Sequence, residues 1–141
     1  MSGTKQPQFV DTNILIYAHD RSAGQKYERA RALVEQLWDN GNGCLSIQVL
    51  QEFYINMTRK VTHPLAPQPT ARIIADLSSW SVHRPGVEDI LQAIDLQERF
   101  AISFWDAMIL ASAQQLQCEV LWSEDLNTGQ LYGQTRVCNP F

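Results

Sequence analysis

Residues 8–18 of the chain read QFVDTNILIYA, a short apolar run that meets an acid and is followed at once by a second apolar run. We predict a strand over residues 8–10 that stops at Asp11, and a helix or helical turn over residues 13–18. A strand that leads directly into a helix is the repeating unit of folds in which helices cover a parallel sheet. In such a fold the same unit recurs along the chain.

The pattern continues along the chain. Helices are predicted over residues 23–39, 46–59, 70–79 and 87–100, with another beginning at Ser103, and short strands over residues 44–45, 80–83, 119–122 and 135–138. Residues 61–69 contain three prolines and are predicted to form a loop. The predicted fold class is therefore α/β, a three-layer sandwich in which a short, mainly parallel sheet is flanked by helices.

Two sets of apolar residues are expected to be buried. In the helix over residues 87–100 they recur at the helical period and are Val87, Ile90, Leu91, Ile94 and Phe100. The second set consists of the three cysteines, Cys44, Cys118 and Cys138. They follow no CxxC spacing, so they fit neither a zinc site nor a disulfide framework, and free cysteines are usually buried.

Length and composition are those of a single folded domain over residues 1–141. The chain has 15 acidic and 11 basic residues, a formal net charge of −4, and is 45% hydrophobic and 18% charged. This composition excludes disordered and collagen-like chains, and the acidic balance argues against binding nucleic acid through a general positive field. Residues 1–7 are expected to form a disordered extension.

The chain has no run of about 18 apolar residues, and its first residues, MSGTKQPQ, lack the apolar core of a signal peptide. We therefore expect a cytoplasmic protein without a membrane partner.

Three acids stand where predicted elements begin or end. Asp11 and Asp125 follow strands, and Asp106 lies in the first turn of the helix that begins at Ser103. The carboxyl ends of parallel strands meet at one edge of a sheet, so Asp11 and Asp125 are expected to lie close together there. Gathered carboxylates repel one another unless a cation intervenes, and oxygen ligands favour Mg²⁺ or Mn²⁺ over zinc.

Four segments carry a family resemblance: FVDTNILIYA (residues 9–18), SIQVLQEFY (46–54), ISFWDAMILASA (102–113) and VLWSEDLNTG (120–129). In this order they resemble the four acidic motifs of the PIN domain, and specifically those of the short VapC-type toxin ribonucleases of bacterial toxin–antitoxin systems. The residues that match the acidic quartet, and so are implied to be catalytic and metal-binding, are Asp11, Glu52, Asp106 and Asp125. Asn13 and Ser123 match polar positions that support the quartet.

The resemblance implies a function as well as a fold. It implies a metal-dependent endoribonuclease, the toxin of a type II toxin–antitoxin module, which uses Mg²⁺ or Mn²⁺ to activate water against RNA phosphodiester bonds. It also implies a cognate antitoxin that covers the acidic cleft, and a homodimer. Arg59, Lys60 and Arg72 flank the proline-rich loop and are the candidates for RNA contact.

Structural roles remain open for each of these residues. Asp11 also suits a helix N-cap, Ser103 and Asp106 suit a capping box, and Ser123 with Asp125 suits a turn. Glu52 also suits a solvated helix face, as do the basic residues. For Trp105, core packing is favoured over stacking on a base because its neighbours are apolar.

Other functions also remain open. A non-toxin PIN nuclease of RNA processing and a non-catalytic PIN-like binding module are both compatible with the fold. A phosphohydrolase of the haloacid dehalogenase kind is disfavoured, because it requires Asp-x-Asp and here Thr12 and Asn13 follow Asp11.

Overall fold

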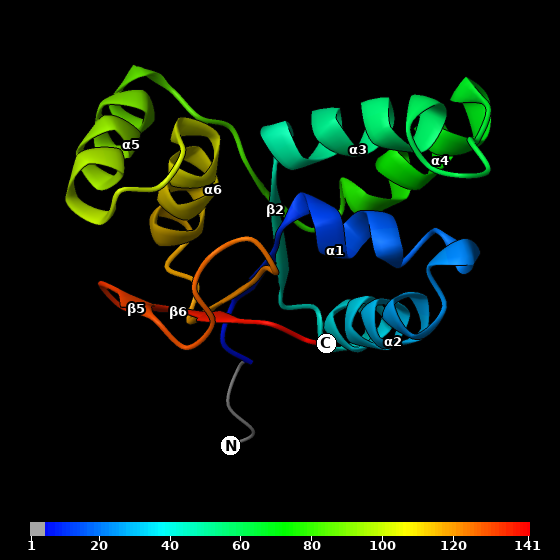
Figure 1. The fold of residues 1–141 in the computed structure, drawn as a ribbon, viewed down its shortest axis with the longest axis horizontal. Helices are drawn as coiled ribbons and strands as arrows, with labels where there is room; N and C mark the ends of the chain where they lie inside the picture. The colour runs from blue at the N-terminus through cyan, green and yellow to red at the C-terminus, as the bar shows by residue number, and fades with distance from the viewer. Residues whose placement is uncertain (1–4) are drawn as a thin grey trace.

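A six-stranded sheet forms the centre of the computed structural model, which describes residues 5–141 (Figure 1). Its strand order is β3-β2-β1-β4-β6-β5, and every neighbouring pair is parallel except β5 with β6. The strands are β1 (Gln8–Val10), β2 (Gly43–Ser46), β3 (Ser81–His83), β4 (Val120–Trp122), β5 (Leu131–Tyr132) and β6 (Thr135–Cys138).

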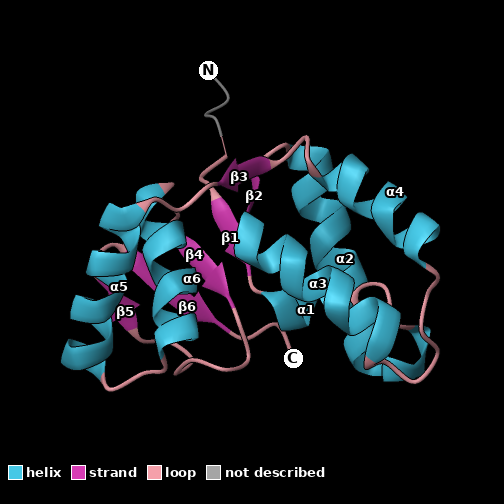
Figure 2. Ribbon diagram, turned by 90° about the horizontal axis from the view of Figure 1, so that it is seen from above, coloured by secondary structure: helices cyan, strands magenta, loops and turns pink. Residues whose placement is uncertain are grey.

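Helices lie in two groups beside the sheet, with α5 and α6 on one side and α1 to α4 on the other (Figure 2). They are α1 (Thr12–Tyr17), α2 (Gln25–Asn40), α3 (Ile47–Arg59), α4 (Pro67–Leu77), α5 (Val87–Phe100) and α6 (Phe104–Gln115). A 3₁₀ turn, Arg21–Ala23, precedes α2. The predicted α/β sandwich with a mainly parallel sheet is confirmed. Within residues 5–141 no helix combines the length and the apolar character needed to cross a membrane.

The central strand β1 fixes the geometry of the site. Phe9 and Val10 are completely buried between the neighbouring strands β2 and β4. Val10 lies opposite Trp122, and the Asp11 amide continues the ladder by donating to the Trp122 carbonyl at 2.9 Å. Asp11 and Ser123, which follow the paired residues, are therefore brought side by side at the carboxyl edge of the sheet.

Some element boundaries differ from prediction. α4 begins at Pro67, so the loop covers residues 61–66 rather than 61–69, since proline is well suited to the first turn of a helix. α2 begins at Gln25 rather than residue 23, and the two-residue strand β5 carries too little pattern to be predicted. Cys138 is partly exposed, whereas Cys44 and Cys118 are buried as predicted.

The predicted extension, residues 1–7, is described only in part, because residues 1–4 lie outside the described chain. The Gln6 carbonyl accepts a hydrogen bond from the Asn42 side chain at 2.8 Å, and the Pro7 carbonyl accepts one from the Glu119 amide at 3.0 Å. Gln6 and Pro7 are thus tied to the sheet through residues next to β2 and β4.

The predicted buried face of α5 is wrong except at Phe100, which is partly buried and packs against the core. Val87 and Leu91 are 73% and 61% exposed, and Ile90 and Ile94 are exposed as well. The residues that α5 buries are Ala93 and Leu96. Apolar residues recur at helical spacing on two faces of this helix, so periodicity alone does not decide which face meets α6.

Gly43 in β2 lies against the indole ring of Trp80. A Cβ atom at this position would lie 2.4 Å from Cε3 of Trp80, a distance that atoms do not tolerate. We predict that Gly43→Ala lowers the free energy of unfolding by about 1–3 kcal/mol, because the indole must move out of its packed position. Denaturant unfolding of the purified protein measures the change.

A double-mutant cycle provides the control. Trp80→Leu removes the ring that a Cβ would meet, so Gly43→Ala should cost much less in that background. Equal costs in both backgrounds would show that the contact with Trp80 is not the cause.

Candidate active site

A cavity of about 430 Å³ lies beside the carboxyl ends of the strands and is lined by all four predicted acids: Asp11, Glu52, Asp106 and Asp125. Asn13 and Lys60 also line it, whereas Ser123 lies behind Asp11 and is completely buried. Arg59 and Arg72 are exposed and lie outside the cavity lining. The fold thus brings together four carboxylates from distant parts of the sequence.

Asp11 is the most constrained of these acids. It is only 4% exposed, and its two carboxylate oxygens accept hydrogen bonds from the Thr12 amide at 2.7 Å and from the Ser123 hydroxyl at 2.8 Å. The first bond makes Asp11 the N-cap of α1. The structural role left open by the sequence is therefore present, and the same carboxylate also lines the cavity.

The acids of the cavity affect one another electrostatically. Burial raises the pKa of Asp11 to about 7, the bonds from Ser123 and Thr12 oppose this, and the charges of Asp125 and Asp106 raise it further. Burial also raises the pKa of Asp125, assisted by the charge of Asp106. Lys60 lines the same cavity, but within residues 5–141 no ion pair joins a basic side chain to these acids.

Glu52 is held by Thr12, a residue that the sequence analysis did not select. The Thr12 hydroxyl donates to Glu52 Oε1 at 2.6 Å, and Gln48 Nε2 donates to Oε2 at 3.3 Å. Thr12 is 5% exposed. Its position between Asp11 and Asn13 was the available signal, because a hydroxyl at the start of a helix can reach a neighbouring carboxylate. Glu52 is consequently a fixed residue of the cavity rather than a freely solvated one.

Asp106 is placed by the start of α6. Ser103 is the N-cap, and its hydroxyl oxygen accepts the Asp106 amide at 3.1 Å. The cap uses the backbone of Asp106, so it leaves the carboxylate available to line the cavity. The capping interpretation and the site interpretation are again compatible.

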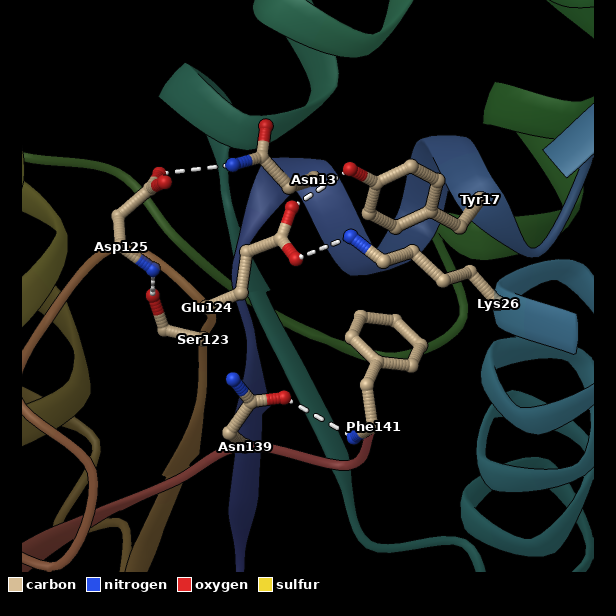
Figure 3. A network of polar contacts seen from close by, with 8 residues as sticks. All are labelled: Asn13, Tyr17, Lys26, Ser123, Glu124, Asp125, Asn139 and Phe141. Atoms are coloured by element: carbon tan, nitrogen blue, oxygen red, sulfur yellow. Dashed lines mark hydrogen bonds and ion pairs between the residues drawn. The ribbon is translucent and has the colours of Figure 1, made fainter.

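Asp125 is oriented by two polar neighbours (Figure 3). Asn13 Nδ2 donates to Asp125 Oδ2 at 2.8 Å, and the Asp125 amide donates to the Ser123 hydroxyl oxygen at 3.1 Å. Because the Ser123 hydroxyl also donates to Asp11, this one side chain links the two acids that follow β1 and β4.

Glu124, although adjacent to Asp125, belongs to a separate cluster (Figure 3). The Tyr17 hydroxyl donates to its Oε1 at 2.5 Å, and Lys26 Nζ lies 2.9 Å from its Oε2. Lys26 also lies 5.0 Å from the ring centre of Tyr17 and 5.3 Å from that of Phe141. The loop that carries Ser123 and Asp125 is thereby anchored to α1 and α2.

Two basic residues of α2 are held in ion pairs. Lys26 is paired with Glu124, and Arg31 is paired with Glu35 at 2.9 Å within the helix. Because each already pairs with an acid, neither is a preferred candidate for contact with an RNA phosphate.

Trp105 is the clearest departure from the sequence interpretation. The prediction of core packing is wrong, because the side chain is 62% exposed and lines the cavity. Its neighbour Phe104 packs against the core instead. Adjacent residues of a helix point about 100° apart, so the apolar sequence around Trp105 did not determine its direction.

The donor set of the cavity suits a hard cation, because carboxylates and amides line it and His and Cys do not. Within residues 5–141, however, no three His, Cys, Asp or Glu side chains are close enough to hold one ion together. The acids surround the cavity rather than converge on a point. Such an arrangement fits an ion like Mg²⁺ that keeps part of its water shell.

Comparison with known proteins identifies one family and several solved structures with a similar fold. The PIN domain family matches residues 9–133 of the chain, while no curated protein matches it. A toxin–antitoxin complex from Klebsiella pneumoniae is 22% identical with a TM-score of 0.68, over 95% of this chain and 98% of that one. The DNA-bound VapBC of Salmonella typhimurium is 18% identical with a TM-score of 0.67, over 97% and 100%.

A further similar structure is VapC20 from Mycobacterium tuberculosis, described as a toxin that cleaves the sarcin–ricin loop. It is 18% identical with a TM-score of 0.63, over 84% of this chain and 89% of that one. At these identities the likeness establishes a shared fold.

The raised pKa of Asp11 predicts a stabilising substitution. In the unfolded chain this carboxyl loses its proton near pH 3.8, whereas in the folded protein it holds the proton up to about pH 7. Stability of the metal-free protein is thus lost as the pH rises through this window. Asp11→Asn cannot ionise, and with EDTA present we predict that it exceeds the wild type by on the order of 2 kcal/mol at pH 8.

The pH dependence distinguishes this cause from a general packing effect. The difference between Asp11→Asn and the wild type in thermal or denaturant unfolding should shrink towards pH 4. Asp95→Asn, an exposed acid on α5, is the matched control and should show no such trend. A difference that is independent of pH would refute the assignment to Asp11 ionisation.

Proposed function

The chain belongs to the PIN domain family, and from this premise we propose that it is a metal-dependent endoribonuclease. The observation that carries the proposal is the cavity, which is lined by four carboxylates from separate parts of the chain, none of them in an ion pair among the described residues. Among the described residues the ion pairs are those of Lys26, Arg31, His83 and Arg99, and none involves an acid of the cavity. Uncompensated carboxylates at one site favour a bound divalent cation.

Mg²⁺ or Mn²⁺ is the proposed cofactor, and the residues proposed to hold it, directly or through water, are Asp11, Glu52, Asp106 and Asp125. The bound ion supplies positive charge at the scissile phosphate and lowers the pKa of a water molecule. The chain itself keeps the ligands in place. Ser123 and Thr12 fix Asp11, Thr12 also fixes Glu52, and Asn13 fixes Asp125.

RNA is the proposed substrate, with three basic side chains as its contacts. Lys60 lines the cavity and is the one best placed to meet a phosphate near the acids. Arg59 is its exposed neighbour at the end of α3, and Arg72 is exposed on α4. We assign Arg59 and Arg72 to phosphates outside the cavity, where they would position the strand without reading its sequence.

The toxin role is proposed from the solved structures that share this fold. The similar solved structures include toxin–antitoxin complexes and a ribonuclease toxin. We propose that this chain is likewise the toxin of a type II module, homodimeric and cytoplasmic. Its partner would be an antitoxin that places a basic side chain among the unpaired carboxylates, because that charge is complementary to the cavity.

Cleavage of RNA by the purified protein tests the nuclease proposal. We predict cleavage with Mg²⁺ or Mn²⁺ and none with EDTA. Asp11→Asn should lower the rate on the order of 100-fold or more, and Ser123→Ala, which acts through Asp11, by about 10- to 100-fold. The measurement is the initial rate on a labelled RNA.

Asp95→Asn is again the matched control, because this acid lies on α5 and pairs with Arg99. It should cleave at the wild-type rate. Cleavage that persists unchanged with EDTA and in Asp11→Asn would show that it needs neither a divalent cation nor Asp11, and would overturn the proposal.

Expression in a bacterial host tests the toxin role separately. We predict that the wild-type chain arrests growth, that Asp11→Asn does not, and that coexpression of the small open reading frame beside its gene relieves the arrest. A host that grows normally while the purified protein cleaves RNA would favour a PIN nuclease of RNA processing instead.

A further inference from the structure

Trp105 exposes a large aromatic surface at the place where RNA is proposed to bind. Its side chain is 62% exposed and lines the same cavity as the acids. Ile55, which is 38% exposed on α3, lines this cavity as well. A single exposed apolar residue needs no explanation by itself. An exposed indole that lines an acidic, polar cavity does call for an explanation, because its aromatic surface is available to a ligand bound in the cavity.

The backbone of Trp105 is hydrogen-bonded to a residue that lines the cavity. The Trp105 carbonyl accepts a hydrogen bond from Gln48 Nε2 at 3.3 Å, and the same amide group lies 3.3 Å from Glu52 Oε2. Trp105 also directly precedes Asp106 in the first turn of α6. Its position relative to two of the acids is therefore set by the backbone.

The ring also has a support on one side. The rings of Phe104 and Trp105 form a T-shaped pair, with the ring centres 5.1 Å apart and the planes at 74°, and Phe104 itself packs against the core. Such pairs are favourable, and the contact with Phe104 still leaves the Trp105 side chain 62% exposed.

Building on the proposed nuclease function, we propose that Trp105 is a stacking platform for one unpaired nucleobase of the RNA beside the scissile phosphate. Every base has a π-face, so stacking of this kind tolerates different sequences. In a duplex both faces of a base are already covered by its neighbours. The platform therefore selects single-stranded or looped RNA over double-stranded RNA.

The electrostatics of the chain give this contact its importance. The protein carries a formal net charge of −4, and acids line the cavity. Phosphate attraction is consequently weak, apart from Lys60 and a bound cation. Stacking contributes affinity that depends on neither charge nor salt, and Trp105 is the aromatic residue that lines this cavity.

Equilibrium binding, measured without cleavage, tests the proposal. The probe is a short fluorescein-labelled, mixed-sequence single-stranded RNA, titrated with protein that carries Asp11→Asn, and the comparison is a blunt duplex of the same sequence. In this background Trp105→Ala should weaken binding of the single strand by about 5- to 150-fold and leave duplex binding nearly unchanged. Trp105→Phe should restore most of the affinity.

Trp38→Ala is the matched control, since Trp38 is 45% exposed on α2 and lies outside the cavity lining. It should bind the single strand as the parent does. Circular dichroism and thermal unfolding should be the same for the Trp105 variants and the parent. If Trp105→Ala binds the single strand as tightly as the parent, or loses equal affinity for the duplex, the platform is refuted.

Kinetics in the wild-type background separate this inference from the nuclease proposal. Trp105→Ala should raise KM with little change in kcat, since stacking acts on bound substrate. If Asp11→Asn abolishes cleavage while KM of Trp105→Ala is unchanged, the platform fails and the nuclease stands. If the wild type binds single strands through Trp105 and cleaves none, the nuclease proposal fails alone. Weakened antitoxin binding with unchanged RNA binding would assign Trp105 to the protein partner and overturn the platform.

Discussion

The burial of the Asp11 carboxylate at the end of β1 is the constraint on which the site depends. A carboxylate in this position is costly, and it is tolerated because a backbone amide and the Ser123 hydroxyl each donate to it. The Ser123 hydroxyl is available only because β4 runs parallel to β1 and ends at the same level. The order of the strands and the chemistry of the edge are thus parts of one arrangement.

The acids at this edge of the sheet differ in the charge of the side chains that hydrogen-bond to them. The acids of the cavity are held by hydroxyls and amides, from Thr12, Ser123 and Asn13. Glu124, the neighbouring acid that turns away, is held by Lys26 as well as by Tyr17. Neutral donors fix direction without cancelling charge, so the cavity keeps its negative potential. An ion pair between a lysine and one of these acids would have neutralised part of the charge that favours a bound cation.

The sequence predicted what local patterns determine. Apolar runs and breakers located the helices and most strands, and the acids at element ends were expected to gather because parallel strands place their carboxyl ends together. It could not predict features that depend on which of two faces meets a neighbour. α5 carries apolar residues on two faces, and the direction of Trp105 depends on how α6 packs. The bonds of Glu124 to Lys26 and Tyr17 join residues 98 and 107 positions apart, with no pattern to reveal them.

The bond between Asp11 and Ser123 spans 112 positions, as does that between Asn13 and Asp125. At a synthesis rate of roughly 5–20 residues per second, Ser123 is therefore added to the chain on the order of 6–20 s after Asp11. A nascent chain has no finished cavity until its last parallel strands are made. The topology thus imposes a delay on activity, and a chain interrupted before β4 would lack the site.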